Sequence, residues 1–151
     1  GTANQLEDYE EGTWTPTCHA AGGSSGGWPS ANTVGYYTKI GRLVHVMFAY
    51  EDFTDQYDTV RGSAGGSAEL TMGGLPFTCQ YYLYTPHVAT WGYNYPNSLS
   101  TATPSLYFYI SDNSTQMLPY FVRDNATGER AIVSNLGQAY IRGQFSYITS
   151  Q

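Results

Sequence analysis

Apolar and polar residues alternate along much of this chain with a period of two, which is typical of β-strands. The even-numbered residues of Val34–Ile40 fall on one side of such a strand and the odd-numbered residues on the other. Ile40–Leu43 then predicts a tight reversal between two antiparallel strands. No amphipathic helix of useful length can be written, because the longest stretch without Gly or Pro, Arg42–Arg61, opens with β-branched and aromatic residues.

The same pattern predicts strands along the rest of the chain, separated by clusters of Gly, Ser, Asn and Asp that favour turns. These strands are Gly12–Cys18, Leu43–Phe48, Ala68–Met72, Pro86–Trp91, Ser105–Ser111, Met117–Arg123, Ala131–Ser134 and Gln138–Thr149. Eight or nine short strands at this spacing predict an all-β fold, an antiparallel β-sandwich or jelly roll. We expect one domain over residues 12–151, preceded by a lead-in over residues 1–11.

Several predicted strands are apolar on both faces. In Ser105–Ser111, Phe108 and Ile110 take one face, and Tyr107 and Tyr109 take the other. An isolated antiparallel sandwich normally exposes one polar face of each sheet to water. Strands of this kind therefore predict that some outer faces meet another subunit.

The composition and charge of the chain argue against several classes of function. Aromatic residues make up 16% of the chain, fifteen of them Tyr, whereas charged residues make up 12%. A net charge of −6 argues against binding to nucleic acid. No apolar run reaches the roughly 18 residues that a membrane-spanning helix needs, and Gly1–Glu11 does not resemble a signal peptide. Cys18 and Cys79 are interpreted as two small buried thiols rather than a disulfide.

Three segments carry a resemblance to a known family. Residues 4–17 read NQLEDYEEGTWTPT, residues 35–46 read GYYTKIGRLVHV, and residues 74–78 read GLPFT. In this order and spacing they resemble a domain found at the C-termini of bacteriophage tail fibres, tailspikes and related virion proteins. The resemblance covers the first half of the chain, and the Tyr-rich second half departs from it.

The resemblance implies a β-sandwich attached to a longer trimeric fibre, located in the virion after assembly in the host cytoplasm. It implies a homotrimer as the natural oligomer, a bacterial surface glycan as the partner, and neither cofactors nor catalytic residues. We therefore expect a receptor-binding domain that binds a glycan without hydrolysing it. Two alternatives stay open: a structural trimerisation or chaperone domain at the fibre tip, and a small polysaccharide depolymerase.

The divergent half contains aromatic segments suited to sugars, whose apolar C–H faces stack on Trp and Tyr rings while their hydroxyls need polar partners. Six aromatic residues fall within sixteen positions and are mixed with amides. The candidate ligand-binding residues are Trp91, Tyr93, Asn94, Tyr95, Tyr82 and Tyr84, with Trp28 in a separate loop. The alternative is that these rings belong to a core or an interface, as tyrosine often does.

Catalytic and metal sites are weakly indicated. Glu51, Asp52, Asp55 and Asp58 form a dense acidic cluster, which is interpreted as a solvated loop, with a cation site as the lesser alternative. Their spacing lacks the pattern of a calcium-binding loop. There is no G-x-S-x-G motif of a hydrolase nucleophile, and His45 is interpreted as a core or interface residue.

Overall fold

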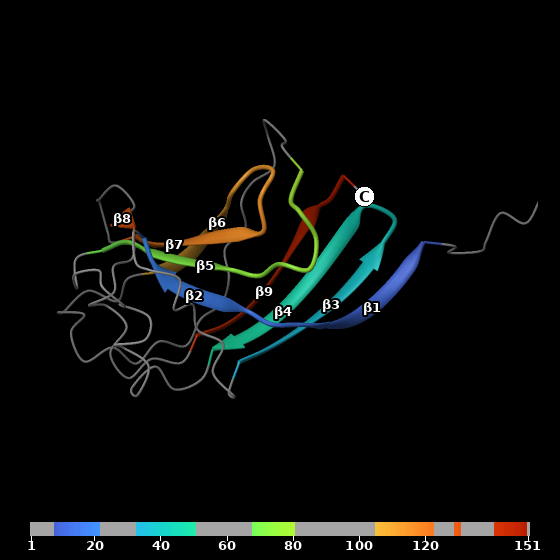
Figure 1. Ribbon diagram of the computed structural model, residues 1–151, viewed down its shortest axis with the longest axis horizontal. Helices are drawn as coiled ribbons and strands as arrows, with labels where there is room; N and C mark the ends of the chain where they lie inside the picture. Colours follow the sequence, from blue (N-terminus) through green and yellow to red (C-terminus); the bar gives the residue numbers. More distant parts are fainter. Residues whose placement is uncertain are drawn as a thin grey trace, which may run out of the picture.

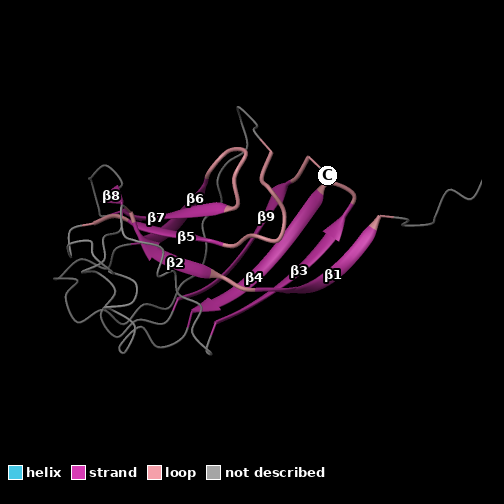
Figure 2. Ribbon diagram, viewed as in Figure 1, coloured by secondary structure: helices cyan, strands magenta, loops and turns pink. Residues whose placement is uncertain are grey.

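The computed structural model describes residues 8–21, 33–50, 68–80, 105–122, 129–130 and 141–150. Every regular element in these ranges is a strand, as Figure 2 shows. The strands are β1 (Tyr9–Trp14), β2 (Thr17–Ala20), β3 (Thr33–Ile40), β4 (Leu43–Tyr50), β5 (Leu70–Gly73), β6 (Ser105–Ile110), β7 (Gln116–Val122), β8 (Glu129–Arg130) and β9 (Ile141–Ile148). The described part of the chain holds no helix capable of spanning a membrane.

The strands form two antiparallel sheets (Figure 1). Sheet A has the order β1-β3-β4-β9, and sheet B has the order β2-β5-β7-β6, with β8 paired to β7. The expected all-β class with antiparallel sheets is therefore confirmed, in an arrangement consistent with a β-sandwich.

The first strand of each sheet comes from one continuous segment that bends between them (Figure 1). β1 ends at Trp14 and β2 begins at Thr17, so Pro16 lies in the bend, where its missing N–H removes no ladder hydrogen bond. The prediction of a single strand over Gly12–Cys18 is wrong. Pairing begins earlier, at Tyr9, and the proline divides the segment between two sheets.

The core lies between the sheets and is centred on Phe48. Its ring centroid lies 5.5 Å from that of Phe108 in sheet B, and 6.3, 5.7 and 6.1 Å from those of Trp14, Tyr50 and Phe145 in sheet A. All four pairs have the edge-to-face geometry that aromatic quadrupoles favour, worth about 0.5–1.5 kcal/mol each beyond burial. The Tyr50 hydroxyl also donates to the Thr17 carbonyl over 2.9 Å, which links the two sheets.

The expected hairpin is confirmed, because β3 and β4 pair up to Ile40 opposite Leu43. Gly41 in the turn has a φ of +57°, a conformation that glycine adopts without strain. The predicted strands near residues 33–50, 70, 105, 117 and 141 are present, with ends shifted by a few residues. The predicted strands Pro86–Trp91 and Ala131–Ser134 lie outside the described residues.

Candidate functional site

The residues predicted to bind a ligand all lie outside the described part of the chain. These are Trp28, Tyr82, Tyr84, Trp91, Tyr93, Asn94 and Tyr95. The acidic cluster of Glu51, Asp52, Asp55 and Asp58 also lies outside it. Both hypotheses stay predictions, and the sites considered below come from the described residues alone.

Two glycines make room for aromatic rings that extend from one strand over the other in the β1–β3 pair. Gly35 is paired with Trp14, and a Cβ on Gly35 would lie 2.3 Å from the indole Nε1. Gly12 is paired with Tyr37, and a Cβ on Gly12 would lie 2.9 Å from the ring of that tyrosine. Each strand thus supplies one ring and one glycine to the other, an arrangement that fixes the register of the pair.

The bend between the sheets is held by a third glycine. Gly74 has a φ of +79°, and a Cβ there would lie 2.4 Å from the Thr15 carbonyl oxygen. Three residues later, the Phe77 ring meets the Tyr37 ring edge-to-face at 5.3 Å. Its backbone N–H donates to the Tyr147 hydroxyl, and that hydroxyl donates to the Phe77 carbonyl over 2.9 Å. The described residues of the three segments that carry the family resemblance therefore pack against one another.

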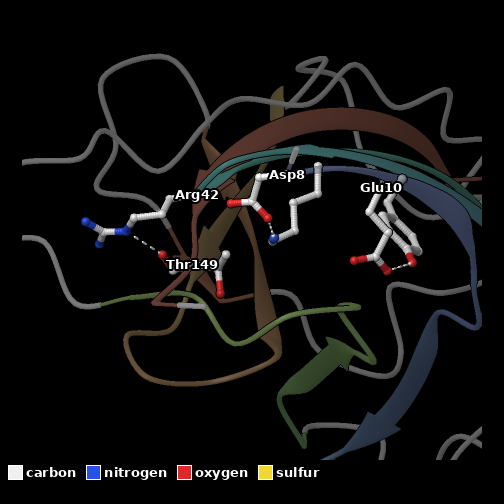
Figure 3. A network of polar contacts seen from close by, with 6 residues as sticks. Asp8, Glu10, Arg42 and Thr149 are labelled. Carbon is white, nitrogen blue, oxygen red and sulfur yellow. Dashed lines mark hydrogen bonds and ion pairs between the residues drawn. The ribbon is translucent and has the colours of Figure 1, made fainter. Parts of the chain in front are cut away.

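Three polar contacts connect the strands of sheet A to their surroundings (Figure 3). Lys39 is buried, and its Nζ lies 3.3 Å from Asp8 Oδ1 and 5.6 Å from the Phe77 ring centroid. The Tyr37 hydroxyl donates to Glu10, and Arg42 Nε donates to the Thr149 carbonyl over 3.0 Å. The first two contacts attach the start of β1 to β3, and the third joins the turn between β3 and β4 to the residue that follows β9.

The outer face of sheet A is apolar. Among the described residues, all the exposed large hydrophobic side chains lie on it: Tyr9, Val34, Tyr36, Ile40, Leu43 and Met47. Pairing aligns Tyr9, Ile40, Leu43 and Ile148 in one row across all four strands. Tyr36 and Met47, 50% and 46% exposed, lie two rows further along the strands, beyond a row of polar residues. We call this outer side of sheet A the apolar face.

His45 lies on the apolar face, in a polar row beside Thr38 and Ser146. It is half-buried, and its Nδ1 is 3.0 Å from Ser146 Oγ. The interpretation of His45 as a core residue is wrong, because Val44 and Val46 take the inward positions of the strand. Its interpretation as an interface residue stays a prediction.

The outer face of sheet B has a different chemistry. Tyr107 and Tyr120 are directly paired, and their rings stack at 5.3 Å with an interplanar angle of 17°. Arg130 pairs with Tyr120 on the other side, and its guanidinium lies 5.4 Å from that ring. Arg130 also donates to the Leu70 carbonyl over 2.7 Å and lies 3.2 Å from Glu69.

A second row completes this surface. Tyr109 follows Tyr107 at two residues, on the same side of β6, because Phe108 and Ile110 between and beyond them are buried. All three tyrosines are half-buried, whereas Glu69 is 52% exposed at its side chain. We call Tyr107, Tyr109, Tyr120, Arg130 and Glu69 the tyrosine–arginine face.

Ionisable groups in the core are held neutral. Burial raises the pKa of the Cys18 thiol, of the Tyr50 hydroxyl and of the Tyr147 hydroxyl. Both cysteines are buried and free, which confirms their interpretation as thiols. A reactive cysteine needs a lowered pKa, and burial moves the pKa of Cys18 and of Cys79 the other way.

Metal binding finds no support in the described ranges. No group of three His, Cys, Asp or Glu side chains in them could hold a metal ion. The candidate sites that these ranges offer are two outer surfaces, the apolar face and the tyrosine–arginine face.

Sequence reasoning missed the tyrosine–arginine face as a unit. Alternation in β6 placed Tyr107 and Tyr109 together, but Tyr120 and Arg130 join them only through strand pairing. A register prediction for the β6–β7 hairpin, with its Asp112–Ser114 turn, would have brought the two tyrosines together.

Comparison with known proteins does not name a relative. No family model matches the chain, and no curated protein matches it. The resemblance of residues 4–17, 35–46 and 74–78 to phage tail-fibre domains therefore stays a prediction.

Proposed function

We propose that this chain is a receptor-binding domain at the tip of a phage tail fibre or tailspike, a homotrimer that binds a bacterial surface glycan without hydrolysing it. A jelly-roll strand order and the virion as its location belong to the same proposal. The motif resemblance supports the class of protein. The observation that carries the proposal is the apolar face of sheet A.

The apolar face favours a second copy of this chain as its occupant. Six large hydrophobic side chains on this face are 41% to 50% exposed, and gatherings of exposed apolar side chains often mark interaction sites. The charges on this face lie at its opposite edges, with Glu11 on β1 and Arg142 on β9. In a closed ring, where each copy contacts the next with a different edge, these opposite charges can meet while the aliphatic rows stay dry.

A trimer also suits a glycan receptor. Single saccharide contacts are weak, and three linked sites raise the apparent affinity for a surface that displays many copies of the ligand. The structural alternative, a trimerisation domain without a receptor, uses the same apolar face. Glycan binding therefore separates the two functions, and oligomeric state alone does not.

The oligomer is tested by sedimentation equilibrium on the parent and two variants. Leu43→Lys places a charge in the centre of the apolar row, whereas Gln116→Lys places one at an exposed position on sheet B. We expect trimers for the parent and for Gln116→Lys, and monomers for Leu43→Lys with an unchanged far-UV spectrum. A monomeric parent at micromolar concentration would contradict the proposal.

The receptor is tested by screening the purified domain on an array of bacterial capsular and O-antigen polysaccharides. Binding with no release of reducing ends supports an adhesin, and a trimer that binds no polysaccharide supports the structural alternative. Reducing-end release that disappears in Glu51→Gln or Asp52→Asn would instead establish a depolymerase.

A further inference from the structure

The two outer faces of the molecule call for occupants of different chemistry. The apolar face presents aliphatic side chains, which gain most from a dry protein partner. The tyrosine–arginine face presents aromatic rings with polar ends, a guanidinium and a carboxylate. Such groups keep hydrogen-bonding capacity after their apolar surface is covered, so they suit a ligand that is itself apolar on one side and polar at its rim.

The stack on this face is ordered before any ligand arrives. Tyr120 lies between the ring of Tyr107 and the guanidinium of Arg130. Arg130 is in turn held by the Leu70 carbonyl and the Glu69 carboxylate, and its side chain is only 18% exposed. A preordered surface loses little side-chain entropy on binding, so a small ligand that forms few contacts can still bind to it.

Charge identifies the class of ligand. Arg130 is already neutralised by Glu69, and the whole chain carries a net charge of −6, so an anionic ligand would be repelled at long range. A neutral ligand meets no such barrier. The Glu69 side chain is 52% exposed and can accept from hydroxyls, and the two terminal nitrogens of Arg130 carry more N–H groups than the contacts with Leu70 and Glu69 use.

We propose that the tyrosine–arginine face is a binding site for a neutral saccharide. One sugar ring packs on Tyr107 and Tyr109. Because Tyr120 lies between Tyr107 and Arg130, the hydroxyls of neighbouring sugar units bond to Arg130 and Glu69. This inference rests on the proposed glycan-binding function and deepens it, because it moves the site from the aromatic segments of residues 81–97 to the strands of sheet B.

The direct test uses the parent protein with defined probes. Methyl α-glucopyranoside, methyl α-galactopyranoside, methyl α-mannopyranoside and N-acetylglucosamine are titrated to millimolar concentration, with glucuronic acid as the anionic comparator. Nuclear magnetic resonance follows the tyrosine ring signals. We expect a neutral probe to shift the Tyr107 and Tyr109 signals, with little change between 50 and 500 mM NaCl. A response to glucuronic acid alone, a steep loss with salt, or shifts confined to other residues would overturn the site.

Variants test the same site through the polysaccharide that the array identifies. Tyr107→Ala should raise the dissociation constant for this polysaccharide about tenfold, which corresponds to a loss of about 1.4 kcal/mol in binding free energy. Tyr107→Phe should retain most of the affinity because it keeps the stack. Gln116→Ala is the control, since Gln116 is exposed on β7 about 13 Å from Tyr120 along the strand.

The outcomes separate this inference from the function on which it rests. An array with no binding removes both. A parent that binds while Tyr107→Ala, folded, binds equally well removes only the site on sheet B. If Tyr107→Ala does not fold, the tyrosine signals of the parent decide the question.

Discussion

Replacing Gly35 with Ala tests whether the packing of the Trp14 ring over Gly35 stabilises the β1–β3 pair. The new Cβ would lie 2.3, 2.4 and 2.6 Å from three atoms of the indole, against about 3.5 Å for a comfortable contact, so the ring must move by about 1 Å. That movement breaks the hydrogen bond from Trp14 Nε1 to the Tyr36 carbonyl, now 3.3 Å. It also disturbs the edge contact with Phe48.

The magnitude follows from these contacts. Overpacking costs about 1–3 kcal/mol, and the lost hydrogen bond and ring contact each cost about 1 kcal/mol. Ala has fewer conformations than Gly in the unfolded chain, which stabilises the folded state by about 0.5–1 kcal/mol and offsets part of this cost. We therefore expect Gly35→Ala to lower the free energy of unfolding by about 2–4 kcal/mol, measured by urea denaturation with far-UV circular dichroism.

Two further variants make the reasoning refutable. Gly41→Asn is the control, since no atom lies within 4 Å of a Cβ at Gly41 and Asn tolerates its positive φ, so we expect a change below about 0.5 kcal/mol. In a Trp14→Ala background the space is empty, and Gly35→Ala should no longer destabilise. An equal loss in both backgrounds would show that the indole is not what the new methyl group meets.

Three other perturbations probe the scaffold. Asp8→Asn should cost about 1 kcal/mol, because Lys39 is buried and Asp8 is exposed to screening; urea denaturation should show Lys39→Met recovering part of that loss in the double variant. Burial raises the pKa of the Tyr50 hydroxyl well above its ordinary value near 10, so above that pH the unfolded chain releases a proton that the folded chain keeps, and stability falls by up to about 1.4 kcal/mol per pH unit. Tyr50→Phe should reduce this alkaline slope in urea titrations at pH 9 to 11.5, leaving the part due to Tyr147 and the two cysteines, and an unchanged slope would contradict the assignment. Gly74→Ala should cost more than about 3 kcal/mol in the same urea assay, because its Cβ would meet the rigid Thr15 carbonyl at 2.4 Å and its φ of +79° strains any side chain; a loss below 1 kcal/mol would contradict the close packing of the bend.

Alternation predicted the strands well where one face is buried and the other is not. In β3 and β4 the inward and outward residues follow the sequence pattern, and the turn between them is marked by Gly41. The bend at Pro16 was harder to predict, because a strand that changes sheets keeps its alternation on both sides. β8 was missed because its two residues are too few to show a period.

Long-range contacts explain what sequence reasoning could not place. The sequence does not show why residue 12 is a glycine; the register with Tyr37 shows that the aromatic ring occupies the space a side chain would need. Alternation places Lys39 on the side of the strand opposite Tyr36 but does not predict that its side chain is buried. It is buried because Phe77 and Asp8, from distant segments, cover it.

Alternation in the sequence identifies which side chains point away from the core, but it does not identify their binding partners. The chemistry of those side chains indicates what kind of partner each face suits. Ile40 and Leu43 carry no polar atoms, so water on their exposed surfaces is always less favourable than a protein partner. Tyr107, Tyr120 and Arg130 are separated by thirteen and then ten residues. They form one stack because β6 pairs with β7 and β7 pairs with β8 in a register that aligns them. A surface of this kind orders its own side chains in the absence of a partner and still keeps hydroxyls and partly exposed rings for a small ligand. We therefore propose two physical causes for the same two-sided apolarity in the sequence, self-association through sheet A and ligand recognition through sheet B, and one substitution on each face distinguishes them.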